Sequence, residues 1–180
     1  MQDVYTQLVS ASGQAPDSPV RIGETVLNDI SPSVASDGTH FFVVWVNLLE
    51  VRGQAVAGDG QPMGAQLVIA TGFPTKKREP AVAWDGAEFL VVWRESTIAS
   101  DEIVGQYVAL DEAGDGTLSG PAFPLDPTTG GGQYAPSVAC GAASCLVTWT
   151  HDTYTTEYGN DVRGALVAAA QAVIDELVGA

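Results

Sequence analysis

Apolar runs that end in Trp recur three times along the chain, the third with one Thr. They read FFVVW at 41–45, FLVVW at 89–93 and CLVTW at 145–149. A strand with one buried face alternates apolar and polar residues, so a run that is apolar throughout indicates a strand covered on both faces. We therefore expect three short strands, and we expect the first two, whose runs are apolar throughout, to lie inside a stack of sheets.

A proline-led segment precedes each run at a constant spacing. The segments read PSVASDG at 32–38, PAVAWDG at 80–86 and PSVACGA at 136–142, with starts 48 and then 56 residues apart. Asp-Gly, present in the first two, is a favoured hairpin turn because Gly adopts positive φ and Asp bonds nearby amides. Each copy thus predicts a hairpin of two antiparallel strands.

Two further elements complete each repeat. The third is found at 4–9, 51–56, 103–108 and 162–167, and the fourth at 19–22, 66–69 and 122–125. Four short strands at intervals of this length are typical of propeller blades. We predict an all-β fold, a single β-propeller domain of four-stranded antiparallel blades over residues 1–180.

The repeats divide this domain unevenly. Residues 1–28 supply a half blade, 29–76 and 77–132 supply whole blades, and 133–180 supply a partial blade with an expected C-terminal helix. About 3 to 3.5 blades are fewer than the roughly four to eight of a closed ring. We expect a homodimer in which another chain completes the ring; the alternative is a piece of a longer chain that closes the ring itself.

These repeats resemble the P-x-V-A-x-D-G-x-x-F-L-V-V-W propeller repeats of secreted and surface-attached bacterial proteins. The resemblance covers nearly all of residues 1–168. It implies the fold and says little about activity, because such repeats occur in proteins of many functions.

Two cysteines stand at the turn of the third hairpin. Cys140 ends its first strand and Cys145 begins its second, so they face each other within disulfide reach. We expect a disulfide, with two reduced core thiols as the alternative. A disulfide indicates an oxidising compartment, so we predict an extracellular or cell-surface protein whose signal peptide is not in this sequence.

Charge excludes some partners. With 22 acidic and 7 basic residues the net charge is -15, which disfavours nucleic acid and anionic membranes. We expect no membrane insertion, since no stretch approaches the roughly 20 apolar residues that a span needs. The cationic run 76–78 is interpreted as part of a solvated loop, with an anion site as the alternative.

The sequence contains no recognised catalytic motif, and we predict no cofactor and no metal site. The acidic segment 111–116 lacks calcium ligands at the required positions and is interpreted as a polar hairpin turn. His40 and His151 are interpreted as solvated loop residues.

Loops that join strands two to three and four to one are expected to share one rim of the propeller, where ligands usually bind. The candidate ligand-binding residues there are Tyr134, Asp152, Tyr154 and Tyr158, because aromatic faces stack on sugars or peptides and carboxylates accept hydrogen bonds. We predict a non-enzymatic recognition or scaffold module that binds glycan or protein. The alternatives are a self-assembling structural unit without a ligand, and a hydrolase or lyase using rim carboxylates such as Asp101 and Asp152.

Overall fold

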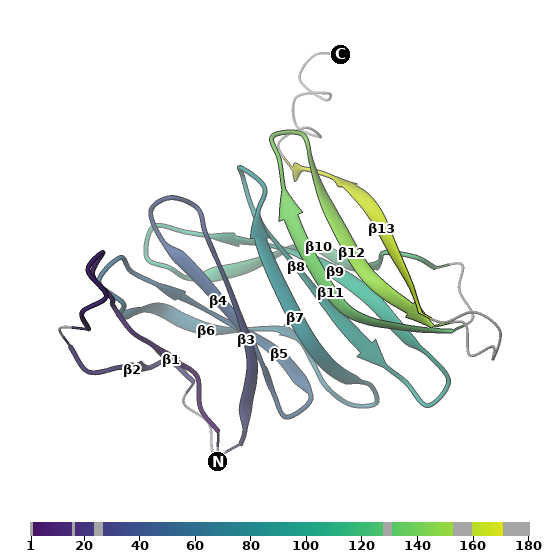
Figure 1. The fold of residues 1–180 in the computed structure, drawn as a ribbon, viewed down its shortest axis with the longest axis horizontal. Coiled ribbons are helices and arrows are strands. Elements are labelled where there is room, and N and C mark those ends of the chain that lie inside the picture. The colour runs from purple at the N-terminus through teal and green to yellow at the C-terminus, as the bar shows by residue number, and fades with distance from the viewer. Residues whose placement is uncertain (1, 16, 24–26, 128–130, 153–159, 171–180) are drawn as a thin grey trace.

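The computed structural model describes residues 2–15, 17–23, 27–127, 131–152 and 160–170. Within this part of the chain the secondary structure is almost entirely β (Figure 1). The strands are β1 (Tyr5–Thr6), β2 (Val20–Arg21), β3 (Asp29–Ser36), β4 (Phe41–Asn47), β5 (Glu50–Val56), β6 (Pro62–Ala70), β7 (Lys76–Trp84), β8 (Phe89–Ser96), β9 (Asp101–Leu110), β10 (Gly116–Pro124), β11 (Gly132–Cys140), β12 (Ser144–Asp152) and β13 (Asp161–Ala168).

Consecutive strands pair antiparallel in three up-and-down groups. We call β3–β6 blade 1, β7–β10 blade 2 and β11–β13 blade 3. Blades 2 and 3 are joined at one point, where Gly132 of β11 pairs in parallel with Asp101 of β9. These groups coincide with the predicted four-element repeat, while the number of blades in a complete ring stays a prediction.

The first strand of each blade lies beside the first strand of the next. β3 packs along β7, and β7 packs along β11, so these three strands run side by side (Figure 1). The blades therefore stack face to face around a common side, which is the radial arrangement of a propeller.

Stacking explains why the Trp-ending runs are apolar at every position. In β8, Val91 and Trp93 pack against blade 1, whereas Leu90 and Val92 pack against blade 3. All four side chains are at most 1% exposed. The prediction of a strand covered on both faces is confirmed for β8, whereas in β12 Leu146 is 47% exposed.

A bulge repeats in each first strand. The residue before the repeated proline has positive φ in all three blades: Ser31 at 56°, Glu79 at 52° and Ala135 at 50°. The strand register breaks at the same place in each blade. A bulge tolerates a proline that cannot donate to the ladder, and it re-aims the neighbouring side chain.

The predicted hairpin turns are present. Gly38 and Gly86 have φ of 94° and 108°, and Asp85 Oδ1 accepts hydrogen bonds from the amides of Ala87 and Glu88, both at 2.8 Å. In blade 3 the predicted disulfide joins Cys140 and Cys145 across the strand pair, with a Cα–Cα distance of 3.9 Å. It therefore links the two strands of that hairpin covalently.

The N-terminal half blade is a short β1–β2 ladder. Val4 and Ile22 beside it pack onto Val43, Trp45 and Val56 of blade 1. The expected C-terminal helix falls almost wholly beyond residue 170, outside the described residues. Among the helices in the described part of the chain, none is long and apolar enough to cross a bilayer.

Two interpretations of the sequence are wrong, and both concern residues at the end of the blades where the first strands begin. The cationic run does not lie in a loop, since β7 already begins at Lys76 and Lys77 is 6% exposed. His151 is also not a solvated loop residue, because β12 continues through Asp152 and buries His151 to 2% exposure on the same face as Trp149. Both strands run further than the apolar pattern alone predicts.

Candidate functional site

Each blade carries a buried polar pair where its first strand begins and its second strand ends. The pairs occupy equivalent register positions: Asp29 with Asn47, Lys77 with Glu95, and Gln133 with His151. Of these six residues, all but Glu95 are less than 9% exposed. Polar side chains thus replace the apolar core at this end of the stack, the end at which the predicted rim loops leave the sheets.

The pair in blade 2 is ionic. Lys77 Nζ lies 3.0 Å from Glu95 Oε1, which also accepts a hydrogen bond of 2.9 Å from Thr75 Oγ1. Partial burial by itself raises the pKa of Glu95, but hydrogen bonds and charge from Lys77, Thr75 and Trp93 outweigh it and hold the pKa below its usual value. This carboxylate is therefore kept ionised as part of the structure.

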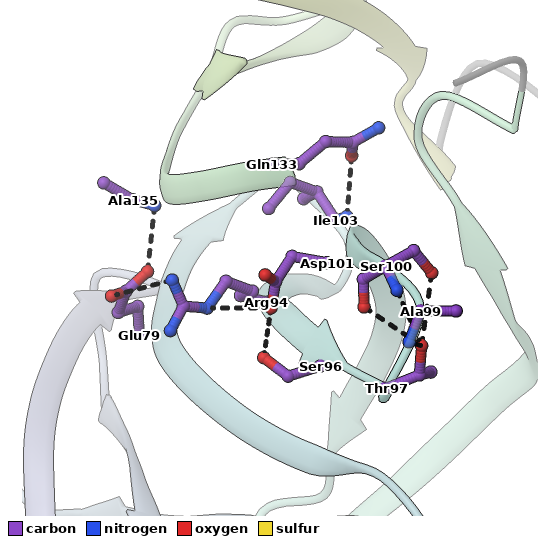
Figure 2. A network of polar contacts seen from close by, with 10 residues as sticks. All are labelled: Glu79, Arg94, Ser96, Thr97, Ala99, Ser100, Asp101, Ile103, Gln133 and Ala135. Atoms are coloured by element: carbon purple, nitrogen blue, oxygen red, sulfur yellow. Dashed lines mark hydrogen bonds and ion pairs between the residues drawn. The ribbon is translucent and has the colours of Figure 1, made fainter. Parts of the chain in front are cut away.

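Next to this pair lies a cluster centred on an arginine, which contacts two carboxylates from different strands (Figure 2). Arg94 of β8 contacts Glu79 of β7 through Nη1 and Asp101 of β9 through Nε, each at 3.7 Å. The Arg94 side chain is only 15% exposed. One guanidinium therefore holds two carboxylates at the same end of blade 2, which we call the Arg94 cluster.

Asp101 is positioned by the tight turn between β8 and β9. Thr97 N donates to Ser100 O at 2.8 Å, and Thr97 Oγ1 accepts hydrogen bonds from the amides of Ala99 and Ser100 (Figure 2). Ser96 Oγ, on the facing strand, donates to Asp101 Oδ1. Among the described residues, Asp101 Oδ2 has no partner, so this oxygen is available to a ligand or a water molecule.

Glu79 is positioned by the bulge of β7. Its Oε2 accepts a 2.9 Å hydrogen bond from the amide of Ala135, the equivalent bulge residue of blade 3. The side chain is 41% exposed. The bulge therefore places a reachable carboxylate where two first strands meet.

Tyr134 covers the other side of Arg94. The Arg94 guanidinium lies 4.9 Å from the centre of the Tyr134 ring, a cation–π distance. The same ring lies over Gly132, where a Cβ would collide with it. Gly132 is thus needed for the aromatic side chain to reach the cluster.

Strand register also aligns the two carboxylates named by the hydrolase alternative. Gly132 pairs with Asp101 on one side and with Asp152 on the other. Directly paired residues point to the same face, and two strand spacings separate the two aspartate Cα atoms by about 10 Å. Asp101 and Asp152 therefore flank a residue without a side chain.

A small cavity of about 150 Å³ adjoins Glu79 between blades 1 and 2. Its walls are formed by β3 and the end of β4 in blade 1 and by residues 76–79 of β7. A larger cavity of about 530 Å³ lies on the outer face of blade 1, but no acidic, basic or histidine side chain lines it. Of these two cavities, the small one therefore adjoins the Arg94 cluster.

The structure brings some predicted site residues together. Tyr134 and Asp152 both adjoin Gly132 next to the Arg94 cluster, whereas Tyr154 and Tyr158 lie outside the described residues. Whether any of the four binds a ligand stays a prediction.

Sequence reasoning missed Glu79 and Arg94. A signal was present in the repeat itself: the position before the repeated proline holds Ser31, Glu79 and Ala135, and only blade 2 has a charged residue there. A charged side chain at a position that the other repeats leave neutral is the feature that could have identified this carboxylate.

Comparison with known proteins supports the fold. Two similar solved structures are a GH43 endo-arabinanase from Bacillus licheniformis, with a TM-score of 0.54 and 13% sequence identity, and the native arabinanase Arb43A from Bacillus subtilis, with a TM-score of 0.54 and 14% identity. The superpositions cover 87% and 88% of this chain but 60% of each solved chain. No protein-family model and no curated protein matches the sequence. At such identity the likeness shows the fold, and the chain spans about 60% of the length of these structures.

This finding contradicts the prediction of a non-enzymatic recognition or scaffold module. Both proteins are enzymes by name, so the fold provides no support for a non-enzyme and favours the hydrolase alternative. The prediction failed because it relied on the absence of a catalytic motif. Carboxylates contributed by separate strands leave no contiguous motif in a sequence.

Proposed function

We propose that this chain forms part of a glycoside hydrolase that cleaves inside an arabinan-like polysaccharide, with Asp101 and Glu79 as its carboxylate pair. The observation that carries the proposal is the contact of both carboxylates with one guanidinium, at 3.7 Å each, in a fold similar to that of endo-arabinanases.

Glycosidic hydrolysis needs one carboxyl group that protonates the leaving oxygen and one that activates water or attacks the sugar. Asp101 fits the second role, because Ser96 and Arg94 hold Oδ1 while Oδ2 has no partner within the described part of the chain. Glu79 fits the first role. It is the more exposed of the two, with 41% of its side chain exposed against 21% for Asp101, so the leaving oxygen of a polysaccharide can reach it.

The separation of the pair is compatible with this chemistry. Because both side chains contact the same planar guanidinium, their carboxylates lie within about 10 Å of each other, and inverting glycosidases have separations of roughly 6.5–9.5 Å. The same upper bound includes the roughly 5–5.5 Å of retaining glycosidases, so NMR of the first product anomer decides between inversion and retention.

Substitution of Asp101 tests the assignment. Asp101→Asn should lower the release of reducing ends from arabinan by about 10²–10⁴-fold, the usual contribution of a positioned acid or base. Asp59→Asn is the matched control, since Asp59 is exposed in the β5–β6 turn at the opposite end of blade 1. The proposal is overturned if the wild-type protein releases no sugar, or if Asp101→Asn retains full activity.

We also propose that a second copy completes the ring. The uncovered faces at the two ends of the stack support this: Val34 and Phe41 of blade 1 are 57% and 43% exposed, and Leu166 of blade 3 is 74% exposed. Exposed apolar faces of stacked sheets favour association. Light scattering should show a dimer that Leu166→Asp converts to monomer, and a stable wild-type monomer would contradict the proposal.

The disulfide supports an extracellular location. Cys140–Cys145 is the single bond in the described structure that requires an oxidising environment to form. We propose secretion on this ground, to be tested by localising the protein in fractionated cells of its source.

A further inference from the structure

Two basic residues stand apart in the charge pattern of this protein. Five of the seven basic side chains contact a carboxylate: Arg21, Arg52, Lys77, Arg94 and Arg163. Lys76 and Arg78 contact none among the described residues, in a chain with 22 acidic residues. Where acids outnumber bases so strongly, two neighbouring cations without a carboxylate partner are an unexpected feature.

Their positions on β7 concentrate positive charge. Lys76 and Arg78 are two residues apart on one strand, so they share a face of the sheet, and both are exposed. Arg78 also pairs directly with Arg94 on β8. Glu79 and Asp101 already offset the charge of Arg94, whereas Arg78 has no carboxylate partner among the described residues.

Strand register brings this charge next to the proposed catalytic pair. Lys76 pairs with Ser96, which donates to Asp101, and Arg78 pairs with Arg94, which contacts both Glu79 and Asp101. Directly paired residues point to the same face of a sheet, so Lys76 and Arg78 lie on the face that carries the Arg94 cluster. An anion held by these two cations would therefore lie beside the proposed catalytic pair.

We propose that Lys76 and Arg78 form a subsite for a carboxylate-bearing sugar, a uronic acid residue of the polysaccharide whose glycosidic bond is cleaved at Glu79 and Asp101. This rests on the proposed function for the place of cleavage. A sugar carboxylate fits better than a dense polyanion, because a net charge of -15 repels closely spaced negative charges, while a single carboxylate within the screening length of about 8 Å responds to the local cations.

The test measures binding in an Asp101→Asn background, so that no ligand is consumed. Isothermal titration compares a short oligosaccharide that carries a single uronic acid residue with the same oligosaccharide after methyl esterification, which removes the negative charge and keeps the sugar rings. We expect the charged oligomer to bind at least tenfold more tightly, and its affinity to fall as salt is added. Lys76→Gln with Arg78→Gln should abolish this preference.

The double variant Arg21→Gln with Arg52→Gln is the matched control. It also removes two positive charges, but from side chains paired with Asp3 and Glu50, and it should keep the preference. The subsite is overturned if both oligomers bind equally, if the preference survives in Lys76→Gln/Arg78→Gln, or if inorganic phosphate binds more tightly than the charged oligomer.

Hydrolysis separates this proposal from the one on which it rests. If neutral arabinan is cleaved by wild type and the preference for the charged oligomer is absent, the subsite fails and the hydrolase stands. If the preference is present and no polysaccharide is cleaved, the hydrolase fails while Lys76 and Arg78 remain an anion site.

Discussion

Blades 1 and 2 repeat one backbone around the bulge but place different side chains on it. At three equivalent positions blade 1 has Ile30, Ser31 and Val46, whereas blade 2 has Arg78, Glu79 and Arg94. Positive φ occurs at the bulge of both blades, and of blade 3 as well. The strained backbone therefore belongs to the fold, and the charged side chains mounted on it in blade 2 are what distinguish the candidate site.

The buried polar pairs show the same contrast. In blade 1 Asp29 accepts hydrogen bonds from Trp45 Nε1 at 3.0 Å and Asn47 Nδ2 at 2.6 Å, and all three residues are at most 2% exposed. In blade 2 the equivalent pair is Lys77 with Glu95, and Glu95 reaches solvent with 27% of its side chain. Blade 1 closes this end of its sheets, and blade 2 leaves it partly open.

Giving blade 2 the bulge residue of blade 1 tests the comparison most strongly. Glu79→Ser should lower kcat on arabinan by about 10²–10⁴-fold, because it removes a proposed proton donor, and should leave the melting temperature nearly unchanged. Ser31→Ala is the control at the equivalent position of blade 1 and should not change kcat. Equal losses in both variants would show that the bulge, and not its carboxylate, matters.

Breaking the ionic pair of blade 2 should have the next largest effect. Lys77→Met leaves Glu95 without its cation and should cost about 2 kcal/mol of unfolding free energy, less than for a fully buried pair because Glu95 is partly exposed. Lys76→Met, one residue away and exposed, should change it by less than about 0.5 kcal/mol. Urea denaturation of both variants measures the difference, and equal stability would refute the structural role of the pair.

The covalent hairpin of blade 3 can be compared with the hairpins that lack a disulfide. Cys140→Ala with Cys145→Ala should cost up to about 2 kcal/mol, the chain-entropy value for so short a loop. Blade 2 holds the equivalent position by the aromatic pair Trp84–Phe89, with ring centres 4.8 Å apart. Calorimetry of the double alanine variant measures the loss, and an unchanged melting temperature would show that the disulfide adds nothing to the hairpin.

Acid should produce the smallest change. Because the folded-state pKa of Glu95 is lowered, its contribution to stability is present above the unfolded value of 4.5 and is lost as pH falls through the folded-state pKa. Glu95→Gln should therefore flatten the decline of stability below pH 4.5. Thermal melts of both proteins across that range measure the slopes, and identical slopes would contradict the assignment.

Much of the architecture could be predicted from periodicity. The Asp-Gly turns and the constant distance from Pro to Trp predict hairpins, and the fully apolar run at 89–93 predicts a strand covered on both faces, which the structure confirms for β8. Facing cysteines predict the disulfide, because a hairpin fixes which residues oppose each other. These features depend on residues close together in the chain, so local physical chemistry determines them.

The candidate site could be predicted only in part. Asp101 and Tyr134 were identified as rim residues, but nothing local joins them to Glu79 or Arg94. The polar ends of β7 and β12 were also missed, because Lys77 and His151 are buried by neighbouring blades and not by their own strand pattern. The pattern of apolar and polar residues along one strand cannot predict burial by a neighbouring blade.

The sequence by itself determined the repeating unit, because turn residues and apolar runs act within a few positions of one another. Only the tertiary structure decided that the charged residue at the bulge of blade 2 shares one guanidinium with Asp101. Blade 3 packs on blade 2 at the same end. There Gly132 of β11 pairs with Asp101 of β9, and the ring of Tyr134 lies against Arg94 of β8. The physical reason is that a guanidinium shared by β7, β8 and β9 depends on distances between strands, which the pairing of these strands in blade 2 sets and the local sequence does not.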